Sequence, residues 1–363
     1  MQRKSPAGRE NCREIAGKRE KRRFGGDFGS RQAAAFDRAV PSNSIDRRDE
    51  IGYNEKTKHE VTGLSALCCS GPPVQALEGV CMSYADQLFI DMCRDILDNG
   101  TSTEGEKVRP RWEDGTAAYT IKRFGIVNRY DLRREFPALT LRKTALKSCM
   151  DEILWIYQKK SADIHDLNSH IWDEWADENG SIGKAYGYQI GVKHAYREGR
   201  MDQMDRVLYD LKNNPFSRRI MTNTYVHADL SEMRLYPCAY GVTYNVTQGR
   251  GEDRLTLNMV LNQRSQDVLM ANNWNVCQYA ILLMMVAQVS GMIPGELLHV
   301  IADAHIYDRH VELVRELIQR ESYPAPKVTL NPEVTDFYAF TTADLQVEGY
   351  RTGPQIKNIP VAV

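Results

Sequence analysis

The order of the elements that the sequence predicts is typical of the α+β class. Strand patterns come in groups with helical patterns between them, and they do not alternate as regular βαβ units, which argues against a doubly wound sheet. Residues 276–289 are apolar almost all round, which is typical of a helix buried inside a fold. We therefore expect a sheet layered with helices, one of them long and central.

Local patterns place the individual elements. Apolar side chains recur at helical spacing from Tyr84 and stop at Asn99-Gly100, which predicts the first helix. Residues 204–211 belong to another helix, which Asn213-Asn214-Pro215 ends. Further helices are predicted at residues 146–157, 276–289 and 309–321. Strands are predicted at residues 119–130, 219–225, 240–247, 255–261, 298–302, 327–330 and 344–350.

Composition excludes several classes of protein. Of 363 residues, 42% are hydrophobic and 26% are charged, which is usual for a folded globular chain. The longest strongly apolar stretch is residues 280–287, far short of the roughly 20 residues that span a membrane. The eight cysteines form no CxxC pair and no zinc-type spacing, so we expect reduced thiols, a cytoplasmic location and no metal. A GxGxxG or Walker-type phosphate loop is absent from the sequence.

The net charge of −1 averages two unlike segments. Residues 1–81 carry 15 Lys+Arg and 11 Asp+Glu, a charge of +4, and residues 82–363 carry 32 and 37, a charge of −5. The first segment has no sustained hydrophobic periodicity, so we expect it to be a disordered basic extension. A wrongly assigned start codon, with translation beginning at Met82, is the alternative explanation. The catalytic domain is expected at residues 82–363.

Cys238 is the first candidate for chemistry. It follows Pro237 at the start of a predicted strand, with Arg234 nearby in the sequence. A cysteine is a nucleophile only as the thiolate, which needs positive charge or hydrogen-bond donors around it. The alternative interpretation of a single cysteine is a buried structural thiol.

Two short motifs contain arginines beside serine. They are Ser217-Arg218-Arg219 before one predicted strand and Gln263-Arg264-Ser265-Gln266-Asp267 after another. Guanidinium groups and hydroxyls suit phosphate oxygens, so both motifs are candidates for a phosphate site. For either motif alone, a solvated basic rim is the more common interpretation.

Four further positions carry polar groups where a core would not need them. His305 and Tyr307 alternate at a strand end, so both would face one side and could hold a hydroxyl. Asn275 opens the buried helix, either as its N-cap or as an amide that reads a ligand. Glu152 lies on an apolar helix face, where a carboxylate is either partnered or a proton carrier.

The order of these motifs is more specific than any one of them. From Met82 to Val363 the chain resembles the thymidylate synthase family. The resemblance lies in five motifs that occur in the same order: Arg-Arg, Pro-Cys, Arg-Ser-x-Asp, Asn at the start of a buried helix, and Asp-x-His-x-Tyr. The sequences Ile-Trp-Asp-Glu-Trp at residues 171–175, Ala-Tyr-Gly at 185–187 and Ile-Pro-Val-Ala-Val at 359–363 extend the resemblance. The nearest branch has a small residue after the cysteine.

The resemblance implies a fold and a reaction. The fold would be a mostly antiparallel mixed sheet layered with helices around a long buried helix, and the protein would be a homodimer through its sheets. The enzyme would be a methyltransferase of de novo dTTP biosynthesis. It would convert dUMP to dTMP with 5,10-methylenetetrahydrofolate, which supplies both the carbon and the reducing hydride and leaves as dihydrofolate.

The resemblance also implies roles for individual residues. Cys238 would add to C6 of uracil, and Asn275 would read O4 and N3 of the base. Glu152 would move protons at O4, and Tyr186 would assist removal of the C5 proton. The phosphate of dUMP would be held by Arg264, Ser265, an arginine of a flexible loop that is either Arg109 or Arg111, and Arg218 and Arg219 of the partner subunit. The remaining implied contacts are His305 and Tyr307 with the deoxyribose, Asp267 with the nucleotide and the pterin, and Trp172 and Val363 with the folate.

Three departures from the family pattern stand out. Ala239 follows the cysteine where many members have His, and Ala271 stands where many have Gly. Leu141-Arg142-Lys143 replaces a Thr-Thr-Lys run, so either Arg142 or Lys143 would meet the folate tail. The residue that Ala239 replaces has an ordering role and is not the nucleophile, so we expect activity to survive that change, and we expect Ala271 to tighten the pocket slightly.

Three rival interpretations remain at this level. A pyrimidine hydroxymethylase of the same fold would quench the methylene intermediate with water, but the intact Val-Ala-Val ending favours methylation. A nucleic-acid binder would use the basic residues 1–31, for which we expect only weak, salt-sensitive contacts. An inactive homologue is disfavoured by the intact set of Cys238, Arg264, Asn275 and His305.

Overall fold

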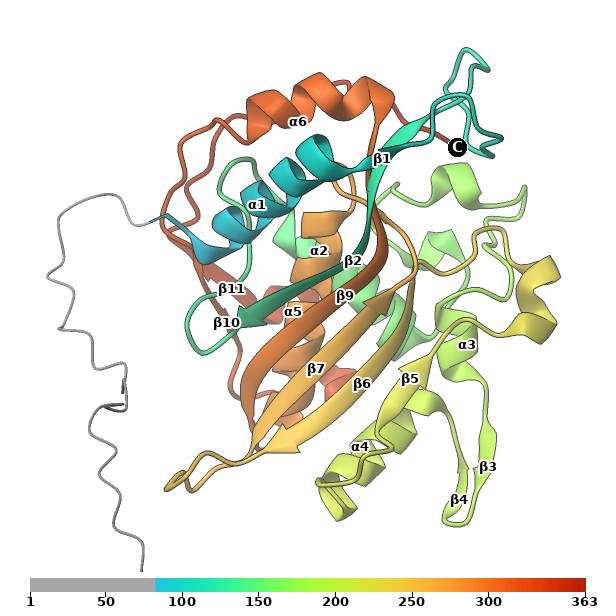
Figure 1. Ribbon diagram of the computed structural model, residues 1–363. Helices are drawn as coiled ribbons and strands as arrows, with labels where there is room; N and C mark the ends of the chain where they lie inside the picture. Colours follow the sequence, from blue (N-terminus) through green and yellow to red (C-terminus); the bar gives the residue numbers. More distant parts are fainter. Residues whose placement is uncertain (1–81) are drawn as a thin grey trace, which may run out of the picture. The chain divides into compact units, whose positions relative to one another are not determined.

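The computed structural model describes residues 82–363 (Figure 1). The basic extension expected at residues 1–81 lies outside the described residues. Among residues 82–363 there is no helix with the length and apolar character needed to cross a bilayer.

A seven-stranded sheet forms the centre of the fold, with the strand order β1-β2-β9-β7-β6-β5 and with β8 paired to β9. All neighbours are antiparallel except that β7 and β8 run parallel to β9. This mixed, mostly antiparallel sheet confirms the predicted α+β class. Its strands are β1 Thr101–Ser102, β2 Thr120–Asp131, β5 Met221–Asn223, β6 Ala239–Thr247, β7 Thr256–Gln263, β8 Gln266–Asp267 and β9 Ile293–Tyr307.

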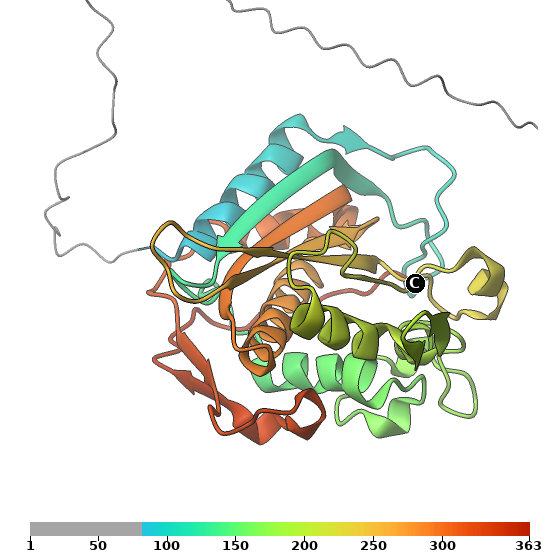
Figure 2. The same ribbon diagram turned by 90° about the horizontal axis from the view of Figure 1, so that it is seen from below.

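Helices cover one face and the edges of this sheet, and two small hairpins stand apart from it (Figures 1 and 2). The helices are α1 Tyr84–Asn99, α2 Leu146–Ile153, α3 Gly187–Gly191, α4 Gln203–Asn213, α5 Asn272–Val289 and α6 Val311–Leu317. The hairpins pair β3 His194–Tyr196 with β4 Gly199–Met201, and β10 Lys327–Leu330 with β11 Leu345–Glu348. A π-helix, Leu154–Lys159, continues α2, and short 3₁₀ helices occupy Ile164–Asp166, Asp173–Trp175, His227–Glu232, Asp308–His310, Phe337–Ala339 and Thr342–Asp344.

Helix α5 is the central helix that the sequence predicts. It packs against β7, β9 and α2, and Figure 2 shows it between the sheet and α2. Its side chains from Tyr279 to Leu283 are all buried, which explains why the segment is apolar on every side. Burial of this helix fixes the position of its first turn, where Asn275 lies.

The opposite face of the sheet is left without a helix and carries exposed apolar side chains. Phe124 is 91% exposed, and Val127 and Met221 are more than half exposed. Along β9 the side chains alternate, with Leu297 buried towards α5 and Leu298 only half-buried on the other face. An apolar sheet face of this kind is typical of a surface that meets another chain.

Several element boundaries differ from the sequence prediction. Strand β9 runs over 15 residues where only residues 298–302 were expected, because the turn formers Pro294 and Gly295 and the polar end of the strand mask its alternation. Helix α5 begins at Asn272 with Ala271 in the N-cap position, so the interpretation of Asn275 as the N-cap was wrong.

The remaining differences are shorter or additional elements. The helix expected at residues 309–321 is a 3₁₀ turn followed by α6, and the strand expected at 219–225 is reduced to β5. The helix expected at 146–157 changes to a π-helix after Ile153, and Lys160, in left-handed conformation with φ 55°, ends it. Strands β1, β3, β4 and β8 and helix α3 were not predicted, because each has five residues or fewer and shows no period.

Candidate active site

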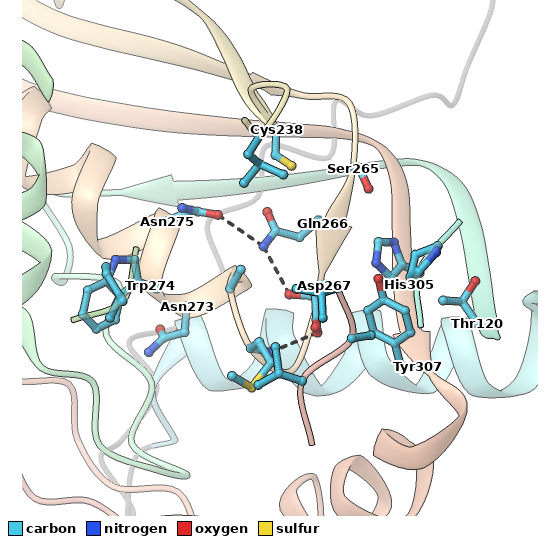
Figure 3. A pocket seen from close by; sticks show the side chains of 18 of the residues that line it. Thr120, Cys238, Ser265, Gln266, Asp267, Asn273, Trp274, Asn275, His305 and Tyr307 are labelled. Atoms are coloured by element: carbon cyan, nitrogen blue, oxygen red, sulfur yellow. Dashed lines mark hydrogen bonds between the residues drawn. The ribbon is translucent and has the colours of Figure 1, made fainter. Parts of the chain in front are cut away.

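A cavity of about 840 Å³ opens at the end of the sheet where β6, β7 and β9 meet the first turn of α5. This volume lies within the range of about 300–1,000 Å³ that is usual for small-molecule sites. The residues that the sequence singled out and that line the cavity are Arg109, Arg142, Lys143, Glu152, Trp172, Tyr186, Cys238, Arg264, Ser265, Asp267, Ala271, Asn275, His305, Tyr307 and Val363. Figure 3 shows Cys238 and Asn275 at one end and His305 and Tyr307 at the other.

Cys238 lies immediately before β6, half-buried at the cavity wall. The Arg264 guanidinium donates from Nη2 to Cys238 Sγ at 3.5 Å, and it is held in place by the carbonyls of Tyr236 and Pro237 at 2.7 and 3.0 Å. Burial raises the pKa of the Cys238 thiol, whereas Arg264 and Arg109 lower it. Positive charge therefore opposes the desolvation that would keep this thiol protonated.

Tyr186 is held in a strained backbone conformation beside this cysteine. Its φ of 40° and ψ of −100° are unfavourable for a non-glycine residue, and such strain concentrates at functional sites. Gly187 follows because a Cβ there would lie 2.1 Å from the Ser161 carbonyl oxygen. The Tyr186 hydroxyl accepts a hydrogen bond from the Cys238 backbone N–H at 3.0 Å. Burial raises the pKa of Tyr186, so the hydroxyl keeps its proton.

Glu152 is a buried carboxylate at the end of α2. Its two oxygens accept hydrogen bonds from the indole N–H groups of Trp172 and Trp274, at 3.0 and 2.7 Å. Burial raises the pKa of this carboxyl group, and the hydrogen bonds partly reverse the shift. A buried carboxyl group with a raised pKa that faces a cavity is suited to carrying protons.

Asn275 lies in the first turn of α5 and is part of a network of amides. Its Oδ1 accepts from Gln263 Nε2 at 3.1 Å and from Gln266 Nε2 at 3.4 Å, and its Nδ2 donates to Gln278 Oε1 at 2.9 Å. Figure 3 shows the contact between the amides of Asn275 and Gln266. The amide oxygen is thereby occupied twice, and one N–H of Asn275 Nδ2 remains to donate to a ligand.

His305 and Tyr307 lie together at the end of β9, as their alternation predicted. Their ring centroids are 5.2 Å apart. His305 Nδ1 is 2.9 Å from Asp303 Oδ1, whose other oxygen accepts from Lys122 Nζ at 2.9 Å, which leaves His305 Nε2 for a ligand. Burial raises the pKa of Tyr307 to about 12, so its hydroxyl is neutral and can donate.

The far side of the cavity combines aromatic rings with charged groups. Trp172 packs on Trp175 and Tyr186, with ring centroids 5.9 and 5.2 Å away, and Asp267 lies on β8. Arg142 is buried and donates to the Leu269 carbonyl, whereas Lys143 is exposed at the cavity.

The C-terminus closes one side of the cavity. The N–H of Val363 donates to the Arg111 carbonyl at 2.9 Å, and the N–H of Arg111 donates to the Val363 carbonyl at 2.7 Å. The Arg111 side chain points to the carbonyls of its own loop, at Val108 and Pro110, while Arg109 lines the cavity. Of the two alternatives for the loop arginine, the geometry favours Arg109.

Arg218 and Arg219 are exposed on the segment that leads into β5 and do not line this cavity. Sequence reasoning missed Trp274, Gln263 and Gln266, which hold Glu152 and Asn275. Their adjacency to motif residues was the only available signal. Within residues 82–363, no cluster of three or more His, Cys, Asp or Glu side chains is arranged to hold a metal ion.

Comparisons with known proteins agree with this geometry. Residues 87–363 match the family model described as thymidylate synthase. The chain belongs to the thymidylate synthase family. It is 40% identical over 280 residues to the thymidylate synthase of Bacillus subtilis subsp. natto and to thymidylate synthase 1 of B. subtilis strain 168, matches that cover 76% of this chain and 98% of each relative.

A solved structure extends the comparison to the fold. The thermostable thymidylate synthase A from B. subtilis superposes with a TM-score of 0.72 at 39% identity, over 77% of this chain and 99% of that one. The reaction of the family is the methylation of dUMP to dTMP with methylenetetrahydrofolate as co-substrate, and this chain is a methyltransferase of that kind. The predicted family, fold, reaction and co-substrate are therefore confirmed.

Proposed function

We propose that Cys238 is the nucleophile of this methylation. The observation that carries the proposal is the position of its sulfur, at the cavity wall within 3.5 Å of the Arg264 guanidinium. Attack of the thiolate on C6 of uracil forms an S–C6 bond and moves an electron pair to C5 and O4. Covalent catalysis of this type replaces one difficult substitution with easier steps. The co-substrate supplies the one-carbon unit and the hydride that reduces it to methyl.

The other cavity residues have roles that fit this addition. Asn275 holds the O4–N3 edge of uracil, and Glu152 delivers and removes the proton at O4 through water. Tyr186, whose hydroxyl keeps its proton, organises removal of the C5 proton beside the cysteine. Loss of that proton breaks the bond between the transferred carbon and the folate nitrogen. The hydride then reduces this carbon to methyl as the S–C6 bond breaks and the thiolate leaves. Hydrogen bonds fix the positions of the Glu152 carboxylate, the Tyr186 hydroxyl and the Asn275 amide.

The rest of dUMP is proposed to lie along the arginines and the end of β9. Arg264, Ser265 and Arg109 would hold the phosphate, since guanidinium groups pair with phosphate oxygens in a bidentate manner. His305 Nε2 and the Tyr307 hydroxyl would hold the deoxyribose 3′-hydroxyl. This arrangement supports a nucleoside monophosphate as substrate.

The folate is proposed to bind against Trp172, between Asp267 and the C-terminal Val363. A flat pterin ring suits an aromatic wall, and Asp267 can accept from its N–H groups. Lys143 is proposed to meet the glutamate tail, because Arg142 is buried against Leu269 and is not free to do so.

A second copy of the chain is proposed to complete the phosphate site. The exposed apolar sheet face around Phe124, Val127 and Met221 supports a dimer through the sheets. Arg218 and Arg219 are exposed and outside their own cavity, which fits a contribution to the partner's phosphate site. We place the dimer in the cytoplasm, with residues 1–81 as an extension that binds nucleic acid only weakly if at all.

Two of the departures from the family pattern are compatible with this function. Ala239 is 5% exposed, so a small apolar residue there leaves no buried polar group without a partner. Ala271 has φ −114°, a conformation open to any residue, so glycine is not required before α5.

The products distinguish this function from hydroxymethylation by the same fold. Purified protein given dUMP and methylenetetrahydrofolate should form dTMP and dihydrofolate in equal amounts, because the hydride that completes the methyl group oxidises the folate. Chromatography of the nucleotide and folate products makes the measurement. Hydroxymethyl-dUMP together with tetrahydrofolate would instead show that water quenches the reaction.

Replacing Glu152 by glutamine should remove the proton carrier while keeping its size. We expect kcat to fall by about 10²–10⁴-fold, the usual contribution of general acid–base catalysis, with little change in the KM for dUMP. Steady-state kinetics with both substrates makes the measurement. Asp151, the neighbouring buried carboxylate that binds Asn168 at 2.8 Å and does not line the cavity, supplies the matched control as Asp151→Asn. A Glu152→Gln variant with unchanged kcat would contradict the assigned role.

A further inference from the structure

A buried chain of side chains leads from strand β9 to Asn275. His299 is fully buried, and its Nε2 is hydrogen-bonded to Gln263 Oε1. Gln263 Nε2 donates in turn to Asn275 Oδ1 at 3.1 Å. Asn275 Nδ2 then donates to Gln278 Oε1 at 2.9 Å. Gln263 and Asn275 each use the amide oxygen on one side and the amide nitrogen on the other, so the orientation of one fixes the next.

His299 determines the direction of this chain. Burial lowers the pKa of His299 to about 3, so the imidazole is neutral and carries a single N–H. Gln263 Oε1 can only accept, so that hydrogen is on Nε2. His299 Nδ1 then has only a lone pair, and it is without a hydrogen-bond partner among the described residues. The opposite tautomer would bury an N–H at Nδ1 with nothing to accept it.

The donor–acceptor direction of this hydrogen-bond chain also fixes the orientation of the Asn275 amide at the cavity. Because Gln263 must turn its NH₂ group towards Asn275, an inverted Asn275 would place one NH₂ group against another. Gln266 also donates to Asn275 Oδ1, at 3.4 Å, and favours the same orientation (Figure 3). The side chain is therefore held with its oxygen towards Gln263 and Gln266 and its nitrogen towards Gln278.

We propose that His299 is a positioning residue that determines specificity for uracil over cytosine, acting through Gln263 on the amide of Asn275. The inference rests on the proposed function, in which Asn275 reads the base. Uracil offers an acceptor at O4 and a donor at N3, whereas cytosine offers a donor at N4 and an acceptor at N3. An amide free to turn by 180° would fit either base, and an amide fixed by His299 fits only uracil.

Two substitutions at position 299 separate this role from simple core packing. His299→Leu removes the donor, so Gln263 can turn and Asn275 can follow. His299→Gln keeps an N–H donor in about the same place and should preserve the chain. Titration calorimetry with dUMP and with dCMP gives the preference of each variant for uracil. We expect His299→Leu to lower the ratio of the dCMP and dUMP dissociation constants by at least about tenfold, mainly through tighter dCMP binding. His299→Gln should keep the wild-type ratio.

The outcomes that overturn the inference are distinct from those that overturn the proposed function. If His299→Leu weakens both nucleotides equally or leaves their ratio unchanged, His299 has only a packing role. If Asn275→Asp leaves discrimination unchanged, Asn275 does not read the base and the proposed function itself is wrong at this position. Should His299→Leu fail to fold, Gln263→Glu tests the same chain, because a carboxylate can only accept and must turn the Asn275 NH₂ towards itself. That variant should shift preference to dCMP, and an unchanged preference overturns the inference.

Discussion

Replacing Cys238 by alanine should lower turnover by at least about 10⁴-fold, the scale of loss expected when a covalent nucleophile is removed. The protein should still fold and still bind dUMP, because Cys238 is only half-buried and the proposed phosphate and sugar contacts come from other residues. Product formation and the thermal unfolding temperature, measured on the same preparation, test both statements.

A second cysteine supplies the control. Cys93 is completely buried on α1 and away from the cavity, and burial raises the pKa of its thiol. Cys93→Ala should therefore lose some stability through the small space it leaves, but it should keep its turnover. If Cys238→Ala remains active, or if Cys93→Ala is the variant that loses activity, the assignment of the nucleophile is wrong.

Replacing Arg219 by alanine should also cause a large loss of activity, although Arg219 does not line the active-site cavity of its own subunit. In the proposed dimer Arg218 and Arg219 bind the phosphate in the partner's site. Removing one charged partner of such a contact should lower kcat/KM for dUMP by about 10²-fold or more. Exposed Arg197 on the turn of the β3–β4 hairpin is a matched control, and Arg197→Ala should leave kcat/KM unchanged.

Mixing two inactive variants tests whether the arginine acts across the interface. A heterodimer of Cys238→Ala with Arg219→Ala contains one site with both residues intact and one with neither. Random exchange of subunits should therefore restore about a quarter of the wild-type activity. Activity that stays at the level of the separate variants would show that Arg219 serves its own subunit or only supports the fold.

The sequence predicted elements best where one local signal dominates. Helix α1 has a regular apolar stripe and a clear stop at Gly100, and α5 is apolar on all sides, so both were found. Strand β9 was largely missed because it contains Pro294 and Gly295 at one end and polar residues that line the cavity at the other. Its pairing with β2 and β7 overrides those local preferences, and pairing partners far along the chain cannot be read from a window of residues.

The order of the motifs predicted the residues of the site. It did not predict the residues that hold them in place through hydrogen bonds. Cys238, Asn275 and His305 were named because each belongs to a recognisable motif. The bond from Trp274 to Glu152 joins residues 122 positions apart, and the contact of His299 with Gln263 joins two strands. Such contacts depend on the register of the sheet and on the packing of α2 against α5.

The most direct test of the account is to identify the atom that bonds to the pyrimidine. A dUMP analogue with fluorine at C5 cannot lose a proton there, so with methylenetetrahydrofolate present the S–C6 bond should persist. Mass spectrometry of the digested protein should then find the nucleotide and the folate together on the peptide that contains Cys238, in wild-type protein and not in Cys238→Ala. A bond to any other residue, or no covalent species at all, would contradict the account.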